Sequence, residues 1–197
     1  MAILKANNSF LKANGKVLGR KKKESVIFGG IEYGVCKIGN LLWTTENLKN
    51  YTLGAKYFQD SESYKDLGYL YTTSSIVSST NTQSTFIESL VHDGWRVPTK
   101  EDLETLLDVP VNNLKNGLWP TRGDNSSGFN GYPSGTRSYG GSWSDINIFV
   151  IISTSLTYGG NAWYGQLIDS GYNVLSNGGA LINEGQRLRS VRLCKDV

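Results

Sequence analysis

The residue types that most often carry catalysis are scarce in this chain of 197 residues. His92 is the only histidine, so a serine–histidine–aspartate triad would have to use it, and no Gly-x-Ser-x-Gly turn is present. Cys36 and Cys194 are the only cysteines, and with one histidine they leave too few ligands for a zinc site. We interpret His92 and the adjacent Asp93 as structural or exposed. We therefore expect no enzymatic activity, no catalytic residue, no metal ion and no cofactor.

Oxygen-bearing side chains and one adhesion-like tripeptide give weaker signals. Asp124, Asn125 and Asp145 could offer oxygen ligands, but their spacing does not match a calcium-binding loop. Residues 122–124 spell the Arg-Gly-Asp tripeptide that integrins recognise, although a match of three residues recurs by chance. We interpret this segment as a solvated turn.

Side chains suited to binding are concentrated in the C-terminal third, in a glycine-rich sequence. Tyrosine brings contact area at a low entropic cost, and asparagine brings adaptable hydrogen bonds. Aromatic faces with amide and carboxylate partners also suit sugars. The alternative interpretation is that asparagine and glycine only make turns here. We predict that the ligand contacts come from Tyr139, Asp145, Asn147, Tyr158, Asn161, Tyr164, Gln166, Asp169, Tyr172, Asn173, Asn177 and Asn183.

The N-terminal 24 residues carry most of the basic character. They hold seven basic residues and one acidic residue, a net charge of +6, whereas the whole chain carries only +3. A nucleic-acid platform would interleave aromatic residues with the basic ones, but only Phe10 does so. We therefore interpret residues 1–24 as an anchoring arm that docks on another chain of an assembly, rather than on nucleic acid. Its contacts are predicted to come from Lys5, Phe10, Lys12, Lys16, Arg20 and Lys21.

Local patterns predict the elements that position these residues. The dipeptide Asn14-Gly15 lies between two short apolar runs and predicts a β-hairpin over residues 9–20. The body begins near Ser25, and strands are expected at 26–28, 33–38 and 41–43. Further strands are expected at 148–152, 162–164 and 190–193. Because a few helical segments lie between these strand regions, we expect an α+β fold.

Two helical segments stand out. Residues 86–91 place apolar side chains at the spacing of one buried helical face. Thr99 is a favourable N-cap, because Asp102 follows three residues later and complements the helix dipole. We expect this second helix to bury Leu103, Leu106 and Leu107 and to end before residue 110, a proline.

No run of about 18 apolar residues is present, so we expect no membrane-spanning helix. No secretory signal opens the sequence, which indicates a protein kept in the cytoplasm, assembled into a particle there, or given without its leader. Cys36 and Cys194 become neighbours if the first and last strands pair. Two buried thiols are the alternative, and the sequence leaves both open.

A series of short motifs runs through residues 31–197 and resembles one known family. The motifs are Lys-Ile-Gly-Asn-Leu-Leu-Trp-Thr-Thr-Glu-Asn-Leu at 37–48, Gly-Tyr-Leu-Tyr at 68–71, Gly-Trp-Arg-Val-Pro-Thr at 94–99, Gly-Phe-Asn-Gly-Tyr-Pro-Ser-Gly-Thr-Arg at 128–137, Ala-Trp-Tyr at 162–164 and Ser-Val-Arg at 190–192. Their order and spacing resemble those of the Fibrobacter succinogenes major paralogous domain family. Leu188 and Arg189 stand where that family has Gly-Phe, so the core pattern is kept while the surface is specialised.

The resemblance implies a C-type-lectin-like fold with two helices, small irregular antiparallel sheets and paired chain ends, here spanning residues 25–197. The family occurs mostly on bacterial surfaces, and relatives occur in phages. We therefore expect a phage virion component, of the head or a tail fibre, that displays a lectin-like domain to a host-surface glycan or protein and forms a homo-oligomer. The alternative is a bacterial surface adhesin or fimbria-associated module whose leader is missing. A third possibility, an enzyme of the formylglycine-generating type, lacks the paired late cysteines.

Overall fold

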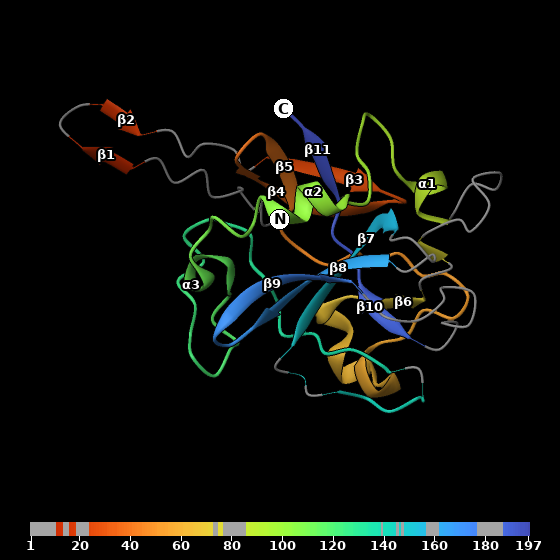
Figure 1. Ribbon diagram of the computed structural model, residues 1–197. Coiled ribbons are helices and arrows are strands. Elements are labelled where there is room, and N and C mark those ends of the chain that lie inside the picture. The colour runs from red at the N-terminus through yellow and green to blue at the C-terminus, as the bar shows by residue number, and fades with distance from the viewer. Residues whose placement is uncertain are drawn as a thin grey trace, which may run out of the picture.

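The computed structural model describes residues 11–13, 16–18, 24–72, 75–76, 86–138, 140–144, 146, 148–156, 162–176 and 187–197. The fold is α+β, as the sequence predicts, and Figure 1 shows short helices beside two sheets. The strands are β1 (Leu11–Ala13), β2 (Lys16–Leu18), β3 (Ser25–Phe28), β4 (Ile31–Ile38), β5 (Leu41–Thr44), β6 (Leu70–Thr72), β7 (Phe149–Leu156), β8 (Ala162–Ile168), β9 (Gly171–Ser176), β10 (Leu188–Ser190) and β11 (Cys194–Asp196).

The described helices are all short. The α-helices are α1 (Phe86–Leu90), α2 (Lys100–Glu104) and α3 (Val111–Leu114), and the 3-10 helices are η1 (Phe58–Asp60) and η2 (Glu62–Leu67). The resemblance led us to expect two helices, and α3 is an addition to that expectation. None of the helices in the described part of the chain is long and apolar enough to cross a membrane.

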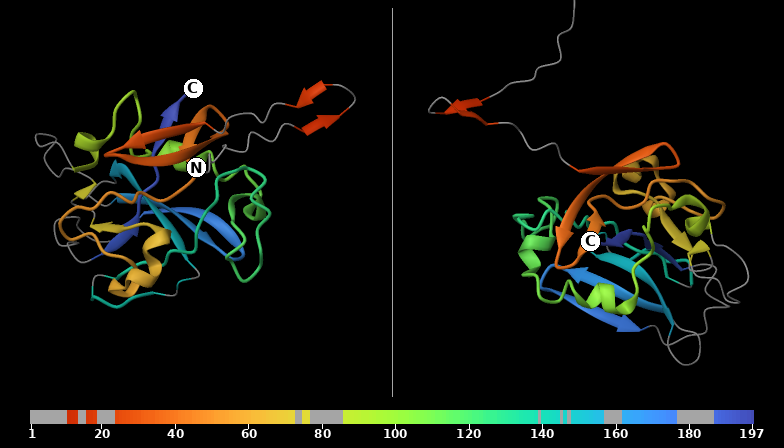
Figure 2. Two further views of the ribbon diagram at one scale, coloured as in Figure 1. Left: turned by 180° about the vertical axis from the view of Figure 1, so that it is seen from behind. Right: turned by 90° about the horizontal axis from the view of Figure 1, so that it is seen from above.

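The predicted N-terminal hairpin is confirmed in its backbone. β1 and β2 pair antiparallel, with Leu11 opposite Leu18 and Ala13 opposite Lys16. The two residues between these strands, Asn14 and Gly15, lie outside the described residues. Figure 2 shows the hairpin apart from the two larger sheets in both of its views.

The first large sheet joins the two ends of the body. Its strand order is β11-β5-β4-β3, and every pairing in it is antiparallel. Cys36 on β4 and Cys194 on β11 both lie opposite Trp43 on β5, one on each side. Their backbones are therefore two strand spacings apart, roughly 10 Å. That separation is too long for a disulfide, and both thiols are free.

The second sheet has the order β6-β10-β7-β8-β9 and curls beneath the first (Figure 1). Most of its pairings are antiparallel, but β10 runs parallel to β7, where Ser190 lies opposite Ile151. The expected antiparallel sheets are therefore present, and this one parallel pairing is an addition to that expectation. The chain reaches β10 only after the β8–β9 hairpin, so β10 enters the sheet between strands from distant parts of the sequence.

The predicted N-cap of α2 is confirmed, and one of its predicted core residues is wrong. The Thr99 side chain accepts a hydrogen bond from the Asp102 amide, while the Asp102 carboxylate accepts one from the Thr99 amide. Leu103 and Leu106 are fully buried, as expected, but Leu107 is 50% exposed. The reason is that α2 ends at Glu104, and the following turn rotates Leu107 out of the buried face.

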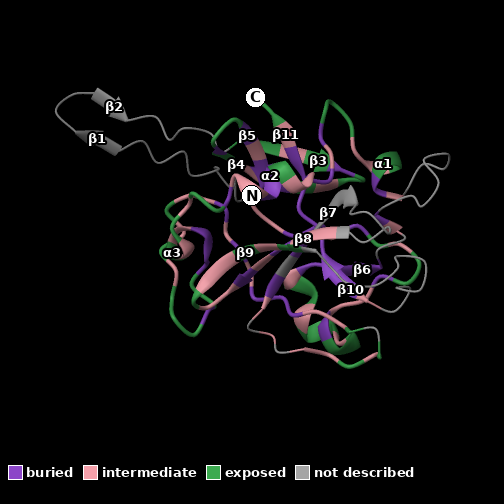
Figure 3. Ribbon diagram, in the orientation of Figure 1, coloured by how far each residue is buried: buried purple, intermediate pink, exposed green. Residues whose placement is uncertain are grey.

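Figure 3 shows the buried residues concentrated between and along the sheets. Among them is a buried arginine, Arg192, which links distant segments of the chain. Arg192 has no exposed surface. Its Nε donates to the Asn47 side chain at 2.8 Å, and its two terminal nitrogens donate to the carbonyls of Thr44, Phe129 and Asn130 at 2.7–2.9 Å. Burial lowers the pKa of Arg192 to about 10. One side chain thus holds two separate segments, 44–47 and 129–130, against the end of the chain.

Candidate functional site

Many of the predicted ligand contacts lie outside the described residues, so the structure places only some of them. Those outside are Tyr139, Asp145, Asn147, Tyr158, Asn161, Asn177 and Asn183. Of the predicted arm contacts, Lys12 lies on β1 and Lys16 on β2, whereas Lys5, Phe10, Arg20 and Lys21 are outside the described residues. Tyr164, Gln166, Asp169, Tyr172 and Asn173 are placed.

Tyr164 and Gln166 line one cavity. They are two residues apart on β8, so their side chains project from the same face of the sheet. The cavity has a volume of about 190 Å³ and is also lined by Thr136, Arg137, Ser138, Arg187 and Arg189. We call it the arginine cavity. It brings together two of the residues that the sequence analysis selected.

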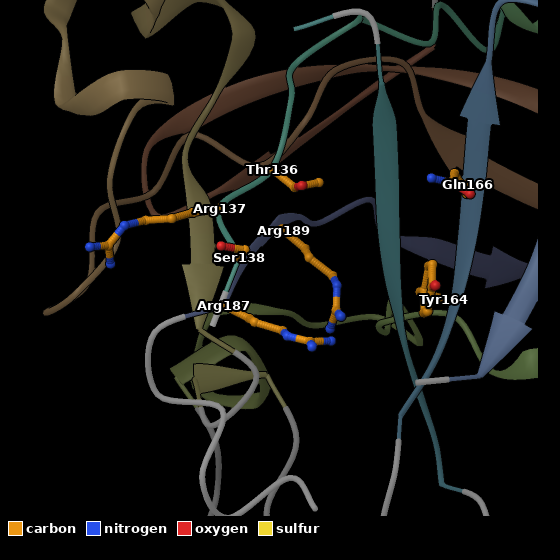
Figure 4. Close-up of a pocket in the computed structure, with 7 residues that line it drawn as sticks. All are labelled: Thr136, Arg137, Ser138, Tyr164, Gln166, Arg187 and Arg189. Carbon is orange, nitrogen blue, oxygen red and sulfur yellow. The ribbon is translucent and has the colours of Figure 1, made fainter. Parts of the chain in front are cut away.

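Arg187 and Arg189 give the cavity its charge. They flank Leu188 and are also two residues apart, so both side chains project from one side of the chain into the cavity, toward Tyr164 (Figure 4). The guanidinium carbon of Arg189 lies 4.9 Å from the centroid of the Tyr164 ring, a cation–π contact. None of the described residues that line the cavity is acidic. The cavity therefore favours a negatively charged group.

A loop closes the cavity on the side opposite β8. Arg137 exchanges two backbone hydrogen bonds with Leu188, each 3.1 Å long, and these hold the loop along β10. The Arg137 side chain points away from the cavity (Figure 4), and its guanidinium carbon lies 5.7 Å from the Trp143 ring. Thr136 and Ser138 then supply hydroxyl groups at the wall. These hydroxyls can donate and accept hydrogen bonds.

Asp169 has a structural role. Its carboxylate accepts hydrogen bonds from the Thr121 hydroxyl and amide and, at 3.1 Å, from Nζ of Lys115, which is completely buried. The hydrogen bond from Thr121 and the one from Lys115 hold the pKa of Asp169 below its ordinary value. The carboxylate thus neutralises a buried ammonium group, and the role of Asp169 as a ligand contact stays a prediction.

Tyr172 is also used inside the fold. Its hydroxyl donates to the Leu103 carbonyl at 3.2 Å, and its ring packs against the core cluster that contains Leu103. Burial raises the pKa of Tyr172 well above its ordinary value. Tyr172 thus contributes to the packing of the fold, and its role as a ligand contact stays a prediction. Asn173, the next residue on β9, is exposed and lies outside the arginine cavity.

The other candidates from the sequence have internal contacts. One ring nitrogen of His92 lies 2.9 Å from the Ile27 carbonyl and the other 2.8 Å from Asp93, and the bond to Ile27 raises the pKa of His92. In the 122–124 segment, a Cβ on Gly123 would overlap the Lys115 carbonyl oxygen. This glycine allows two backbones to approach closely. Among the described residues, no cluster of three or more histidine, cysteine or acidic side chains could hold a metal ion.

The two cavity arginines, Arg187 and Arg189, were not among the residues predicted from the sequence. A usable signal was present, because an Arg-x-Arg pattern in a strand places both side chains on one face. The departure from the family pattern at Leu188 and Arg189 pointed to the same place. Comparisons of the chain with protein-family models, with curated proteins and with solved structures found no match.

Proposed function

We propose that this chain is a non-enzymatic recognition protein and that the arginine cavity binds an acidic group of a surface glycan. The observation that carries the proposal is the convergence of Arg187 and Arg189 with Tyr164 and Gln166 in a cavity whose described lining contains no acidic residue. Two guanidinium groups beside an aromatic ring suit a carboxylate or phosphate attached to a sugar.

The chemistry of each group fits a role in such binding. A guanidinium group offers donors in a planar fork that matches carboxylate and phosphate oxygens. The Gln166 amide both donates and accepts, as sugar hydroxyls require, and Thr136 and Ser138 add hydroxyls at the opposite wall. The Tyr164 ring is held in place by Arg189 and provides an apolar surface at a low entropic cost.

The resemblance to the major paralogous domain family supports the wider role. It favours a C-type-lectin-like display domain with its two chain ends close together. The body's first and last strands, β3 and β11, belong to one sheet and form its two edges, which supports this proposal. The resemblance and the basic arm together support a phage virion component as the first hypothesis and a bacterial surface adhesin as the second. Mass spectrometry of purified particles separates them, because only the first hypothesis requires the chain in a virion.

The binding proposal is tested on a glycan array that carries sialylated, uronic-acid-containing, phosphorylated and neutral glycans. We expect the wild type to retain acidic glycans and Arg187→Ala to weaken that retention by about tenfold or more. Arg122→Ala is the matched control, because it removes one exposed arginine outside the cavity. Equal binding by wild type and Arg187→Ala, or no acidic glycan bound by the wild type, contradicts the proposal.

A further inference from the structure

A second cavity lies among tyrosine side chains that the sequence analysis did not select. It has a volume of about 300 Å³ and is lined by Tyr51, Gly54, Ala55, Lys56, Tyr57, Asp60, Glu62 and Tyr69. We call it the tyrosine groove. It shares no lining residue with the arginine cavity, so an inference about it does not rest on the function proposed above.

The backbone arranges two of these tyrosines as a stacked pair. Lys56 and Leu70 exchange two backbone hydrogen bonds of 3.0 and 2.8 Å, which places Tyr57 and Tyr69 opposite each other on one face. Their rings lie 4.2 Å apart and are inclined by only 14°. Behind them, Tyr71 is buried and its hydroxyl donates to the Asn50 carbonyl at 2.6 Å. The pair is thus backed by the core.

Tyr51 extends this aromatic surface outward. Its ring meets Tyr69 edge-on at 5.6 Å, and the residue remains 62% exposed. The hydrogen bond with Tyr69 is the main cause that raises the pKa of Tyr57 to about 12. The Tyr57 phenol therefore stays protonated at neutral pH, and tyrosine hydroxyls can both donate and accept hydrogen bonds.

Charged groups of both signs stand beside the rings. Lys56 forms an ion pair with Asp60, and Glu62 follows at the start of η2. Gln59 and Asp60 both have positive φ values, of 54° and 56°, which are unfavourable for residues other than glycine. This turn places the Asp60 carboxylate against the Lys56 ammonium group and at the wall of the groove. Such backbone strain is common at binding sites.

From this arrangement we propose that the tyrosine groove binds a neutral saccharide. Two carboxylates disfavour an anion, and the Lys56 ammonium at the wall disfavours a cation. A neutral sugar avoids both penalties, because its hydroxyls accept from Lys56 and donate to Asp60 and Glu62. Its apolar C–H face packs on the exposed ring of Tyr51, while the stacked pair fixes the position of that ring.

The test uses an array of neutral oligosaccharides of glucose, galactose and mannose. We expect the wild-type chain to bind at least one of them, and Tyr51→Ala to weaken that binding by about tenfold. Leu53→Ala is the matched control, because Leu53 is 88% exposed in the same loop but does not line the groove. Binding in the control should equal wild type. Tyr51→Ala should leave the retention of acidic glycans unchanged, which separates this site from the arginine cavity.

Salt and a competing cation complete the experiment. Binding of a neutral saccharide should be the same in low and high salt, because no net charge is neutralised. The proposal is overturned if the wild type binds no neutral oligosaccharide on the array or if Tyr51→Ala binds like wild type. It is also overturned if Leu53→Ala causes the same loss, or if choline binds the groove and displaces the saccharide.

Discussion

Replacing Arg192 with methionine tests the internal framework of the body most severely. Methionine fills a similar buried volume without a charge, but it removes all four of the hydrogen bonds that the guanidinium group donates. The acceptors are the Asn47 side chain and the carbonyls of Thr44, Phe129 and Asn130. Asn47, Thr44 and Phe129 are buried with the arginine, so their oxygens lose their partner on substitution.

The magnitude follows from two opposing effects. Hydrogen bonds from a charged donor contribute about 1.5–3 kcal/mol each, so four of them give roughly 6–12 kcal/mol. Burial of the charge opposes this: the pKa of Arg192 falls to about 10, well below its ordinary value, which corresponds to about 3 kcal/mol. Arg192→Met is therefore expected to lower the free energy of unfolding by roughly 3–9 kcal/mol, a large share of the usual 5–15 kcal/mol of a domain.

Thermal unfolding followed by circular dichroism measures this effect. For a domain of this size, the smaller loss corresponds to a fall in Tm of at least about 6 °C, and the larger one abolishes the cooperative transition. Arg122→Met is the matched control, since Arg122 is exposed, and its Tm should stay within about 2 °C of wild type. If Arg192→Met melts like that control, the role assigned to the buried arginine is wrong.

Four further outcomes test other parts of the account. Thr99→Ala should destabilise by about 1 kcal/mol in chemical denaturation, because it removes the cap of α2. Gly123→Ala should cost about 1–3 kcal/mol in the same assay, since its methyl group would overlap the Lys115 carbonyl. Burial alone would raise the pKa of Asp102, but hydrogen bonds from Arg96 and Thr99 outweigh it and hold the pKa below its ordinary value. The stabilising effect of Asp102 is therefore present above about pH 4 and is lost as the pH falls through the lower folded-state pKa. In melting curves recorded over a pH series, Asp102→Asn should reduce this loss of stability at acid pH. A chain that starts at Ser25 should fold but fail to enter its assembly, and normal incorporation would refute the anchoring role of residues 1–24.

Features that depend on neighbouring residues could be predicted from the sequence. The Asn14-Gly15 dipeptide located the β1–β2 hairpin, and the spacing of Thr99 and Asp102 located the start of α2. Leu107 was placed wrongly because periodicity assumes that a helix continues, whereas α2 ends three residues earlier. In these cases the local backbone determines the outcome.

The two candidate sites depend on pairings between distant residues, which periodicity does not encode. The arginine cavity exists because β10 enters the second sheet beside β7, which brings Arg189 over Tyr164. The tyrosine groove exists because Lys56 and Leu70 pair across thirteen intervening residues. Composition correctly indicated that polar and aromatic groups abound in the C-terminal third. It could not tell Gln166, which faces a cavity, from Tyr172, whose hydroxyl is bound to Leu103.

The most direct test of the central claim is an NMR titration of the labelled wild-type chain with N-acetylneuraminic acid and with glucuronic acid. The account predicts that at least one acid shifts the side-chain signals of Gln166, Arg187 and Arg189, that the shift weakens as salt is added, and that the Arg122 signal stays in place. If neither acid moves these signals, or if the shifts fall outside the arginine cavity, the cavity is not the recognition site.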